Sequence, residues 1–171
     1  MDFSQLVRER CSVRKFSEAP VEPEKLRAVL EAGRLAPTAC NNQPQRIYVL
    51  QSPEALAKIR GVVKYAFNAP IVLMICVNED AAWKNQREPG FSSGEMDASI
   101  VCDHMMLQAA DLGLGTTWVR GYTTEDVMRA FPLPLGERLV CLLPLGYPAE
   151  DARPAPQHSS RRPLEDLVRT L

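Results

Sequence analysis

The chain has 171 residues, 46% of them hydrophobic, and its 20 basic side chains nearly balance its 21 acidic ones. This length suits one domain with a sizeable core and is too short for two ordinary ones, so we expect residues 1–171 to form a single domain. A net charge of -1 gives no field that would collect nucleic acid or an anionic membrane, and we expect neither as a partner. Any binding of anions must depend on local clusters of charge.

The start of the chain and its cysteines bear on its location. No apolar run approaches the roughly 20 residues that cross a bilayer, and Met1 to Ser4 does not resemble the start of a secretory signal. We therefore expect a cytoplasmic protein. The five cysteines are scattered without metal-ligand spacing, which indicates neither a disulfide framework nor a metal site, and we expect most of them to be small core residues. They are Cys11, Cys40, Cys76, Cys102 and Cys141.

Helical and extended patterns alternate along the first half of the chain. Residues 2–9 and 23–35 carry apolar side chains at helical spacing and are predicted as amphipathic helices. A strand is predicted over 46–51 (RIYVLQ), a capped helix over 52–62, and a fully buried strand over 71–77 (IVLMICV).

The second half begins with a polar segment, 79–95, predicted as a long loop, in which Trp83 and Phe91 form either a small lid or two exposed aromatic side chains. The helix predicted over 97–112 is apolar well beyond one face, which places it at the centre of the fold or in a subunit interface. A short strand is expected over 116–119.

The last elements are a helix that Thr124 caps and that reaches about Phe131, a buried strand over 138–145, and a short helix after Pro163. Because Pro144 cannot donate to a sheet ladder, the strand either ends there or has an edge at that point. About four strands and five or six helices indicate an α+β layer structure.

Basic side chains gather directly after the first helix. If the chain is extended there, Arg10, Ser12 and Arg14 project to one side. Two guanidiniums and one hydroxyl then form a good phosphate site, since arginine offers paired charged donors. A solvated basic turn is the alternative interpretation. The pair Arg161 and Arg162 near the other end of the chain allows the same two interpretations.

Two further segments carry neutral polar groups. Residues 35–45 (LAPTACNNQPQ) suit recognition of a flat heterocycle, although a plain turn has a similar composition. In residues 113–126 (GLGTTWVRGYTTED), the Gly-Leu-Gly could suggest a dinucleotide-binding loop. We reject this interpretation, because the third glycine of the fingerprint is absent and the segment follows a helix instead of a strand. Trp118 to Gly121 instead suit the wall of a ligand site.

The combination of these segments resembles the nitroreductase family of flavoproteins. Residues 9–16 (ERCSVRKF) are similar to the R-x-S-x-R-x-F opening of that family. Further similar segments follow in the family's order and span nearly the whole chain. They are 36–44 (APTACNNQP), 68–70 (NAP), 109–118 (AADLGLGTTW), 145–148 (LGYP) and 161–165 (RRPLE).

The resemblance implies an α+β fold with a central, mostly antiparallel sheet, in an intertwined homodimer with FMN at the subunit interface. It implies that residues 10–14 hold the phosphate and ribityl chain, Cys11 through its backbone, and that Arg161 or Arg162 adds a cation. Residues 37–43 would face the flavin, partly from the other subunit, and the backbone of Arg120 and Gly121 would lie near its N5. The expected cofactor-binding residues are Arg10, Cys11, Ser12, Arg14, Pro37, Thr38, Ala39, Asn41, Gln43, Trp118, Arg120, Gly121, Arg161 and Arg162.

The activity implied by the resemblance is transfer of electrons from NADH or NADPH, through the flavin, to a flat acceptor such as a nitroaromatic or a quinone. No catalytic side chain and no metal are expected, so His104 and His158 are not predicted to act in catalysis. Three alternatives remain: a flavin carrier or sensor without catalysis, a flavoenzyme with another reaction such as reductive dehalogenation, and a nucleotide-binding interaction domain without flavin.

Overall fold

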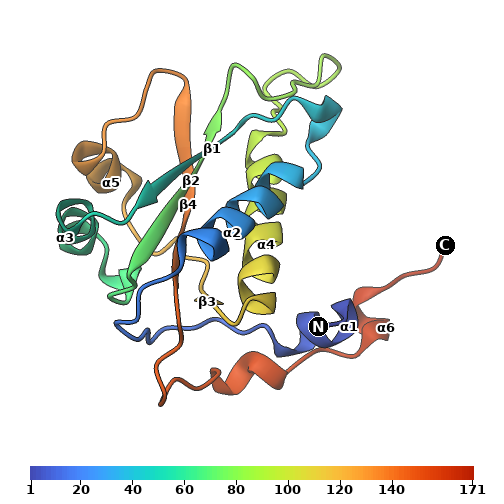
Figure 1. Cartoon of the computed structure of the whole chain (residues 1–171). Helices are drawn as coiled ribbons and strands as arrows, with labels where there is room; N and C mark the ends of the chain where they lie inside the picture. Colours follow the sequence, from blue (N-terminus) through green and yellow to red (C-terminus); the bar gives the residue numbers. More distant parts are fainter.

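A four-stranded antiparallel sheet forms the centre of the computed structural model, which describes residues 1–171 (Figure 1). Its strands are β1 (Gln45–Leu50), β2 (Ile71–Asn78), β3 (Gly115–Thr116) and β4 (Glu137–Gly146), in the order β1-β2-β4-β3. All neighbouring strands are antiparallel. The α+β fold and the predicted strand positions are confirmed, apart from the short third strand.

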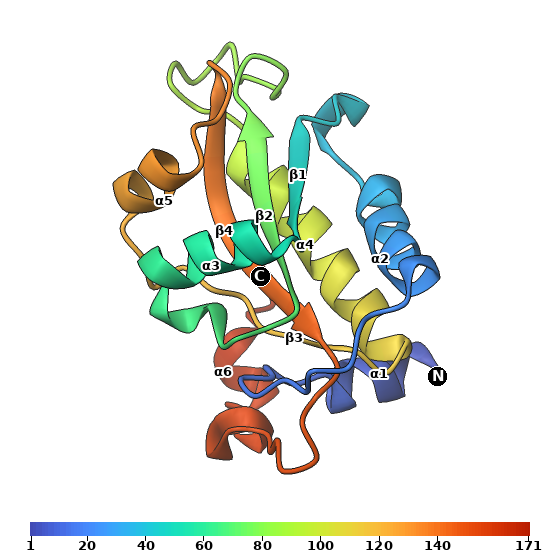
Figure 2. The same cartoon turned by 60° about the vertical axis from the view of Figure 1, so that its left-hand side comes forward.

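Helices cover both faces of this sheet (Figure 2). On one face lie α2 (Pro23–Leu35) and α4 (Gly94–Asp111), and on the other lie α3 (Pro53–Val62) and α5 (Thr124–Ala130). The predicted bounds of α2 and α3 are confirmed, with Ser52 capping α3 through the backbone N–H of Ala55 at 3.2 Å.

The alternation of side chains along β2 supplies both cores. Leu73 and Ile75 belong to the cluster beneath α2 and α4, whereas Val72 and Met74 belong to the cluster beneath α3 and α5. Because a strand between two helical layers has no solvent-facing side, β2 is apolar from Ile71 to Val77. This explains why the sequence shows a continuous apolar run there.

The central helix α4 begins three residues before its predicted start. Residues 92–95 (SSGE) have the composition of a loop. The carbonyl of Ser93 nevertheless accepts the N–H of Asp97 at 2.8 Å, and the Ser93 hydroxyl donates to the Asp97 carboxylate at 2.7 Å. These bonds extend the helix backward to Gly94. The helix ends at Asp111, one residue before its predicted end, and Gly113 at φ +75° follows the C-cap residue Leu112.

Pro144 lies within β4, which continues beyond it to Gly146, so the strand does not end at the proline. The backbone of Leu142 exchanges two hydrogen bonds with Val119 on the β3 side. Pro144, two residues further along, turns its ring nitrogen to that same side. The ladder there is interrupted between Thr116 and Val119. The strand predicted over 116–119 is therefore broken, and Thr117 and Trp118 are free of the sheet.

Several short elements differ from the predictions. The helix α5 follows Thr123, not Thr124, and no side-chain bond caps it. The 3-10 turns Ala39–Asn41, Lys64–Ala66 and Pro156–Ser159 were not predicted. The helix α1 (Phe3–Glu9), capped by Asp2, and the short α6 (Leu164–Leu167) are as expected.

The segment between β2 and α4 is a loop that is closed on itself by a bridge and an aromatic contact. Lys84 and Ser92 form a β-bridge, and the rings of Trp83 and Phe91 pack edge to face with centroids 6.1 Å apart. Arg138 of β4 binds Glu79 at the base of the segment, with 2.8 Å between Nε and Oε1. The two aromatic side chains are half-buried against each other, so the expectation of two exposed aromatics is wrong.

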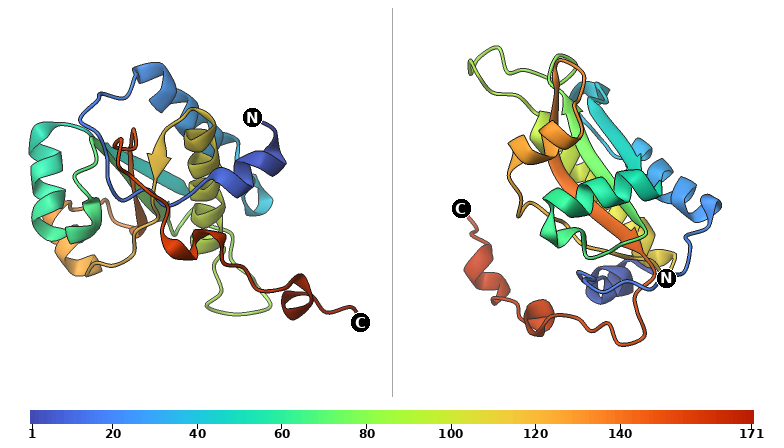
Figure 3. Two further views of the ribbon diagram at one scale, coloured as in Figure 1. Left: turned by 90° about the horizontal axis from the view of Figure 1, so that it is seen from below. Right: turned by 90° about the vertical axis from the view of Figure 1, so that its left-hand side faces the viewer.

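The C-terminal arm, residues 149–171, leaves the body of the chain (Figure 3). Its first turn is held by a salt bridge between Lys15 and Asp151 and by the N–H of Ala149, which donates to the Lys15 carbonyl at 3.0 Å. Further on, Leu164 and Leu167 are 71% and 65% exposed. None of the helices combines the length and the hydropathy needed to span a membrane.

We expect Gly115→Ala to destabilise the fold by about 1–3 kcal/mol, because overpacking of this size is not absorbed without backbone shifts. A Cβ at Gly115 would lie 2.6–2.9 Å from the Val13 side chain. The matched control is Gly61→Ala in α3, where a Cβ meets nothing within 4 Å and should stabilise by roughly 0.5–1 kcal/mol. Urea denaturation measures both, and equal stability of the two variants would contradict the close packing of β3 on residues 10–14.

Candidate functional site

The segment after α1 is extended and lies along β3. The N–H of Val13 donates to the Thr116 carbonyl at 2.9 Å, and Ser12 forms a parallel bridge with Thr116. In an extended chain alternate side chains point to opposite sides. Arg10 and Arg14 therefore share a side with Ser12.

A cavity of about 250 Å³ lies on that side, and we call it the anion pocket. Residues from both ends of the chain meet there, which the fold achieves by returning the C-terminal arm past the end of α1. The pocket has three guanidiniums, a hydroxyl and an imidazole on its walls, and no carboxylate. Its lining residues are Arg10, Ser12, Arg14, Ala155, Gln157, His158 and Arg161. Arg162 is not among them.

The guanidiniums in this pocket lack anionic partners. Nη1 of Arg10 is buried and has no hydrogen-bond partner at all. Arg14 reaches only the carbonyl of Ser12, at 3.4 Å, and Arg161 bonds carbonyls of its own turn, including that of His158 at 2.6 Å. Since burying an unpaired charged donor is costly, a pocket built this way fits a bound anion. A phosphate ester would satisfy it through charge-assisted bonds.

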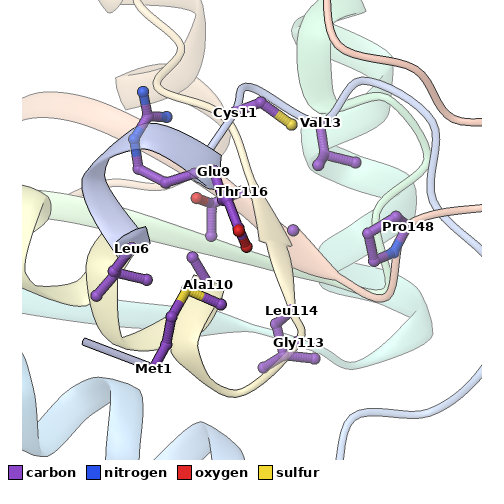
Figure 4. A pocket seen from close by; sticks show the side chains of 12 residues that line it. Met1, Leu6, Glu9, Cys11, Val13, Ala110, Gly113, Leu114, Thr116 and Pro148 are labelled. Atoms are coloured by element: carbon purple, nitrogen blue, oxygen red, sulfur yellow. The ribbon is translucent and has the colours of Figure 1, made fainter. Parts of the chain in front are cut away.

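The opposite side of the same segment faces a largely apolar cavity of about 220 Å³, which Glu9 and Arg10 also line (Figure 4). Cys11 and Val13 lie on one side of it, and Leu6 of α1 and Ala110 of α4 on another. The thiol of Cys11 thus points away from the anion pocket. A contribution of Cys11 to that pocket would have to come from its backbone.

A second cavity of about 230 Å³, here named the aromatic cavity, adjoins the anion pocket through Arg14, which lines both. It lies where Pro144 interrupts the sheet and frees Thr117 and Trp118. Its walls combine aromatic rings with exposed backbone, a composition suited to a flat ring system. The lining residues are Arg14, Tyr65, Phe67, Thr117, Trp118, Val119, Arg120 and Gly121.

Two contacts shape this aromatic cavity. The rings of Tyr65 and Phe67 lie with centroids 5.9 Å apart, and a Cβ at Gly121 would meet the Tyr65 ring at 3.0 Å. The Arg120 guanidinium lies 4.9 Å from the centre of the Tyr122 ring. Burial raises the pKa of Tyr122 and outweighs the opposing effect of Arg120, so the phenol beneath this cation is neutral.

The loop over residues 37–43 lies far from both cavities within one chain. The backbone N–H of Ala39 donates to Asp97 at 2.9 Å, at the N-terminal end of α4. Ser12 instead pairs with Thr116, beyond the C-terminal end of the same helix. From Asp97 to Asp111 the helix axis advances roughly 20 Å. A single chain therefore does not bring together Pro37, Thr38, Ala39, Asn41 and Gln43 with the residues of the anion pocket.

This loop is also conformationally unusual. Cys40, Asn41 and Gln43 have φ angles of 51°, 54° and 50°, in the left-handed region that non-glycine residues rarely adopt. The Thr38 hydroxyl accepts the N–H of Gln43 at 3.0 Å and closes the turn. Such backbone strain gathers at binding sites, where it orients side chains in advance.

Among the lining residues that sequence reasoning missed are Tyr65, Phe67, Gln157 and His158. The aromatic pair directly precedes the segment 68–70, whose similarity to the family was noted, and that position was the available signal. Gln157 and His158 belong to a 3-10 turn that has no periodic pattern. Only the path of the C-terminal arm brings them to the anion pocket.

The buried thiols and the other histidine lie outside both cavities. Cys76, Cys102 and Cys141 are fully buried, which confirms that most cysteines are core residues. Burial raises the pKa of Cys76 to about 12, so this thiol remains protonated. His104 is half-buried on α4, with Nδ1 3.0 Å from the Ile100 carbonyl.

We expect Arg10→Gln to raise the free energy of unfolding by about 1 kcal/mol in phosphate-free buffer, because it removes a buried unpaired charge. Added inorganic phosphate should stabilise this variant less than the wild type, since one of three guanidiniums is lost. Urea denaturation at matched ionic strength, with and without phosphate, measures both effects. A variant that is less stable without phosphate and equally stabilised by it would contradict the proposed anion pocket.

Comparison with known proteins places the chain among its relatives. The family model described as "Nitroreductase family" matches residues 7–67 and 63–147. A protein of Methanothermobacter thermautotrophicus named as NADH dehydrogenase/NAD(P)H nitroreductase is 31% identical over 88% of this chain and 80% of its own.

Solved structures agree with this match. A nitroreductase family protein from Clostridium difficile 630 superposes with a TM-score of 0.92 at 35% identity, covering 100% of both chains. A nitroreductase from Desulfovibrio desulfuricans in complex with FMN gives a TM-score of 0.78 at 26% identity, covering 96% of this chain and 94% of that one. The sequence match and the shared fold lead to one conclusion: this chain belongs to the nitroreductase family.

Proposed function

We propose that the chain is an FMN-dependent oxidoreductase that takes electrons from NADH or NADPH and passes them to a flat acceptor such as a nitroaromatic or a quinone. The observation that carries the proposal is the anion pocket with its unpaired, buried Arg10 donor. FMN joins a phosphate to a flat redox ring, and the chain offers an anion pocket next to an aromatic cavity. Membership of the nitroreductase family and the FMN complex of a relative support the same cofactor.

Different residues of the chain would bind the phosphate and the ring of the cofactor. Arg10, Ser12, Arg14 and Arg161 would hold the phosphate, with the Cys11 backbone beside them. Residues 117–121 and the aromatic side chains of the second cavity would lie along the ring. Bound FMN supplies the two-electron redox chemistry, so no side chain of the chain has to act as a nucleophile and no metal is required.

The protein's own contribution is orientation and electrostatic stabilisation. Arg14, which lines both cavities, would fix the phosphate and ring ends relative to each other. The Arg120 guanidinium, which has no carboxylate partner, would favour negative charge on the adjacent ring. Trp118, Tyr65 and Phe67 would limit the access of water to that ring.

We further propose that the working unit is a homodimer with two shared sites. The strained loop 37–43 lies about one helix length from the anion pocket of its own chain, so it would serve the pocket of a partner copy. The C-terminal arm exposes Leu164 and Leu167, and α4 exposes Met96 at 51%, surfaces that a second copy would cover. Each chain would act as one FMN-binding domain. The cytoplasmic location stays a prediction.

An absorption spectrum of the purified protein tests this function. We expect flavin bands that disappear when NADH or NADPH is added without oxygen and return when a nitroaromatic or quinone is supplied. A yellow protein that neither nicotinamide reduces would indicate a flavin carrier or sensor. Return of the bands only with halogenated aromatic acceptors would indicate reductive dehalogenation. A colourless protein that FMN does not stabilise against heat would contradict flavin binding altogether.

We expect Arg14→Ala to weaken FMN binding by about 10- to 100-fold, because a charge-assisted hydrogen bond contributes roughly 1.5–3 kcal/mol. The matched control is Arg162→Ala, which removes the same charge from a residue outside the anion pocket. Both residues are exposed, so neither change should alter the fold. Equal FMN affinity of the two variants, measured by flavin fluorescence, would count against the assignment of Arg14.

A mixed dimer tests the shared site. If the anion pocket of one chain works with loop 37–43 of the other, a heterodimer of Arg14→Ala and Asn41→Ala chains contains one site with both defects and one intact site. Tagged co-expression and purification of this heterodimer should therefore recover FMN at half the wild-type stoichiometry with wild-type affinity. Two equally weakened sites would show instead that each chain builds its own.

A further inference from the structure

The imidazole of His158 shares the anion pocket with the guanidiniums of Arg10, Arg14 and Arg161. We propose that His158 is a fourth cationic ligand of the cofactor phosphate, and that its protonation makes FMN affinity depend on pH. This inference rests on the proposed function, because it takes the anion to be the phosphate of FMN.

The C-terminal arm holds His158 firmly next to Arg161. His158 lies in the 3-10 turn Pro156–Ser159, where its N–H donates to the Ala155 carbonyl at 2.8 Å. Its own carbonyl accepts Nη1 of Arg161 at 2.6 Å. The two side chains are thus supplied by one turn, and any ligand that Arg161 reaches lies close to His158.

The ring of His158 is free to serve a ligand. No protein group forms a hydrogen bond with it, and the side chain is half-buried in the wall of the pocket. His104 differs, because its Nδ1 lies 3.0 Å from the carbonyl of Ile100, one turn earlier on α4. A half-buried imidazole without a protein partner, facing a cavity that fits an anion, is suited to donate a hydrogen bond to that anion.

The charges around the ring come from every element that forms the pocket. Arg10 at the end of α1, Arg14 in the extended segment and Arg161 in the arm are all cationic. No carboxylate lines the pocket, and two carboxylates of neighbouring segments are engaged elsewhere. Glu9 lines the apolar cavity and accepts from Gln5 at 2.7 Å, and Asp151 is paired with Lys15.

These surroundings couple the proton on His158 to the ligand. A phosphate dianion bound beside the ring favours the protonated imidazole, whose two ring nitrogens both donate. Binding of phosphate then takes up a proton, and by linkage protonation must tighten binding. The sign follows directly: the contribution of His158 is present at low pH, where the ring is protonated, and is lost as pH rises.

The phosphate monoester has an opposing titration of its own, because its second ionisation near pH 6 removes negative charge on acidification. A pH profile of the wild type alone would mix the two effects. The ratio of Kd values between a His158 variant and the wild type cancels the phosphate term. The change of that ratio with pH therefore reports the contribution of His158 to FMN binding.

The experiment measures release of FMN from the purified full-length protein on dilution, by recovery of flavin fluorescence, between about pH 5.5 and 8.5. For His158→Gln we expect Kd to exceed the wild-type value about tenfold at the acidic end and less than about twofold at the alkaline end. His158→Arg, whose charge is permanent, should bind more tightly than the wild type at the alkaline end. His104→Gln is the control, and its ratio should stay near one throughout.

The outcomes separate this inference from the proposed function. A ratio for His158→Gln that does not change with pH, in a protein that binds FMN, overturns the role of His158 and leaves the flavin site intact. The same conclusion follows if His104→Gln alters the profile as strongly. A wild-type protein that binds no FMN at any pH overturns both. If His158→Gln fails to fold, His158→Arg still decides, since a constant ratio for it also contradicts the proposal.

Discussion

Three arginine side chains line one cavity, and no carboxylate lines it with them. The rest of the site depends on this uncompensated charge, because an anion in the pocket would offset the cost of burying Nη1 of Arg10. The fold assembles the cluster from two distant parts of the chain. β3 holds residues 10–14 extended, and the salt bridge between Lys15 and Asp151 directs the C-terminal arm back beside them. The net charge of the whole chain, -1, gives no indication of this local cluster of positive charge.

Two features of the fold shape the site: an interruption in the pairing of β4 with β3, and the length of α4. Pro144 interrupts the ladder with β3, and the freed residues 117 and 118 become the wall of the aromatic cavity. The length of α4 separates the loop 37–43 from the anion pocket by roughly 20 Å. An edge gap in the sheet therefore leaves room for a cavity lined by aromatic side chains, while the long central helix keeps loop 37–43 away from the anion pocket of its own chain. The same helix exposes apolar side chains with which a second copy would pack.

Features with a local cause were predictable from the sequence. The helices 23–35 and 53–62 and the buried strands follow from periodicity and caps, which act between near neighbours in the chain. The alternation of Arg10, Ser12 and Arg14 is local as well, and the structure brings these three side chains to one cavity. The early start of α4 rests on the bonds between Ser93 and Asp97, which the loop-like composition of residues 92–95 obscured. The continuation of β4 past Pro144 depends on its pairing with β2, which is distant in the sequence. His158 joined the site through the path of the arm, which no pattern in the sequence describes.

The central claim is that the phosphate, and not the ring alone, anchors the cofactor. Isothermal titration of the flavin-free protein with FMN and with riboflavin, which lacks only the phosphate, tests this claim most directly. The account predicts that FMN binds at least about a hundredfold more tightly, as two charge-assisted contacts alone would give. Equal affinity for the two flavins would contradict it, because the guanidiniums around the anion pocket would then contribute nothing to binding.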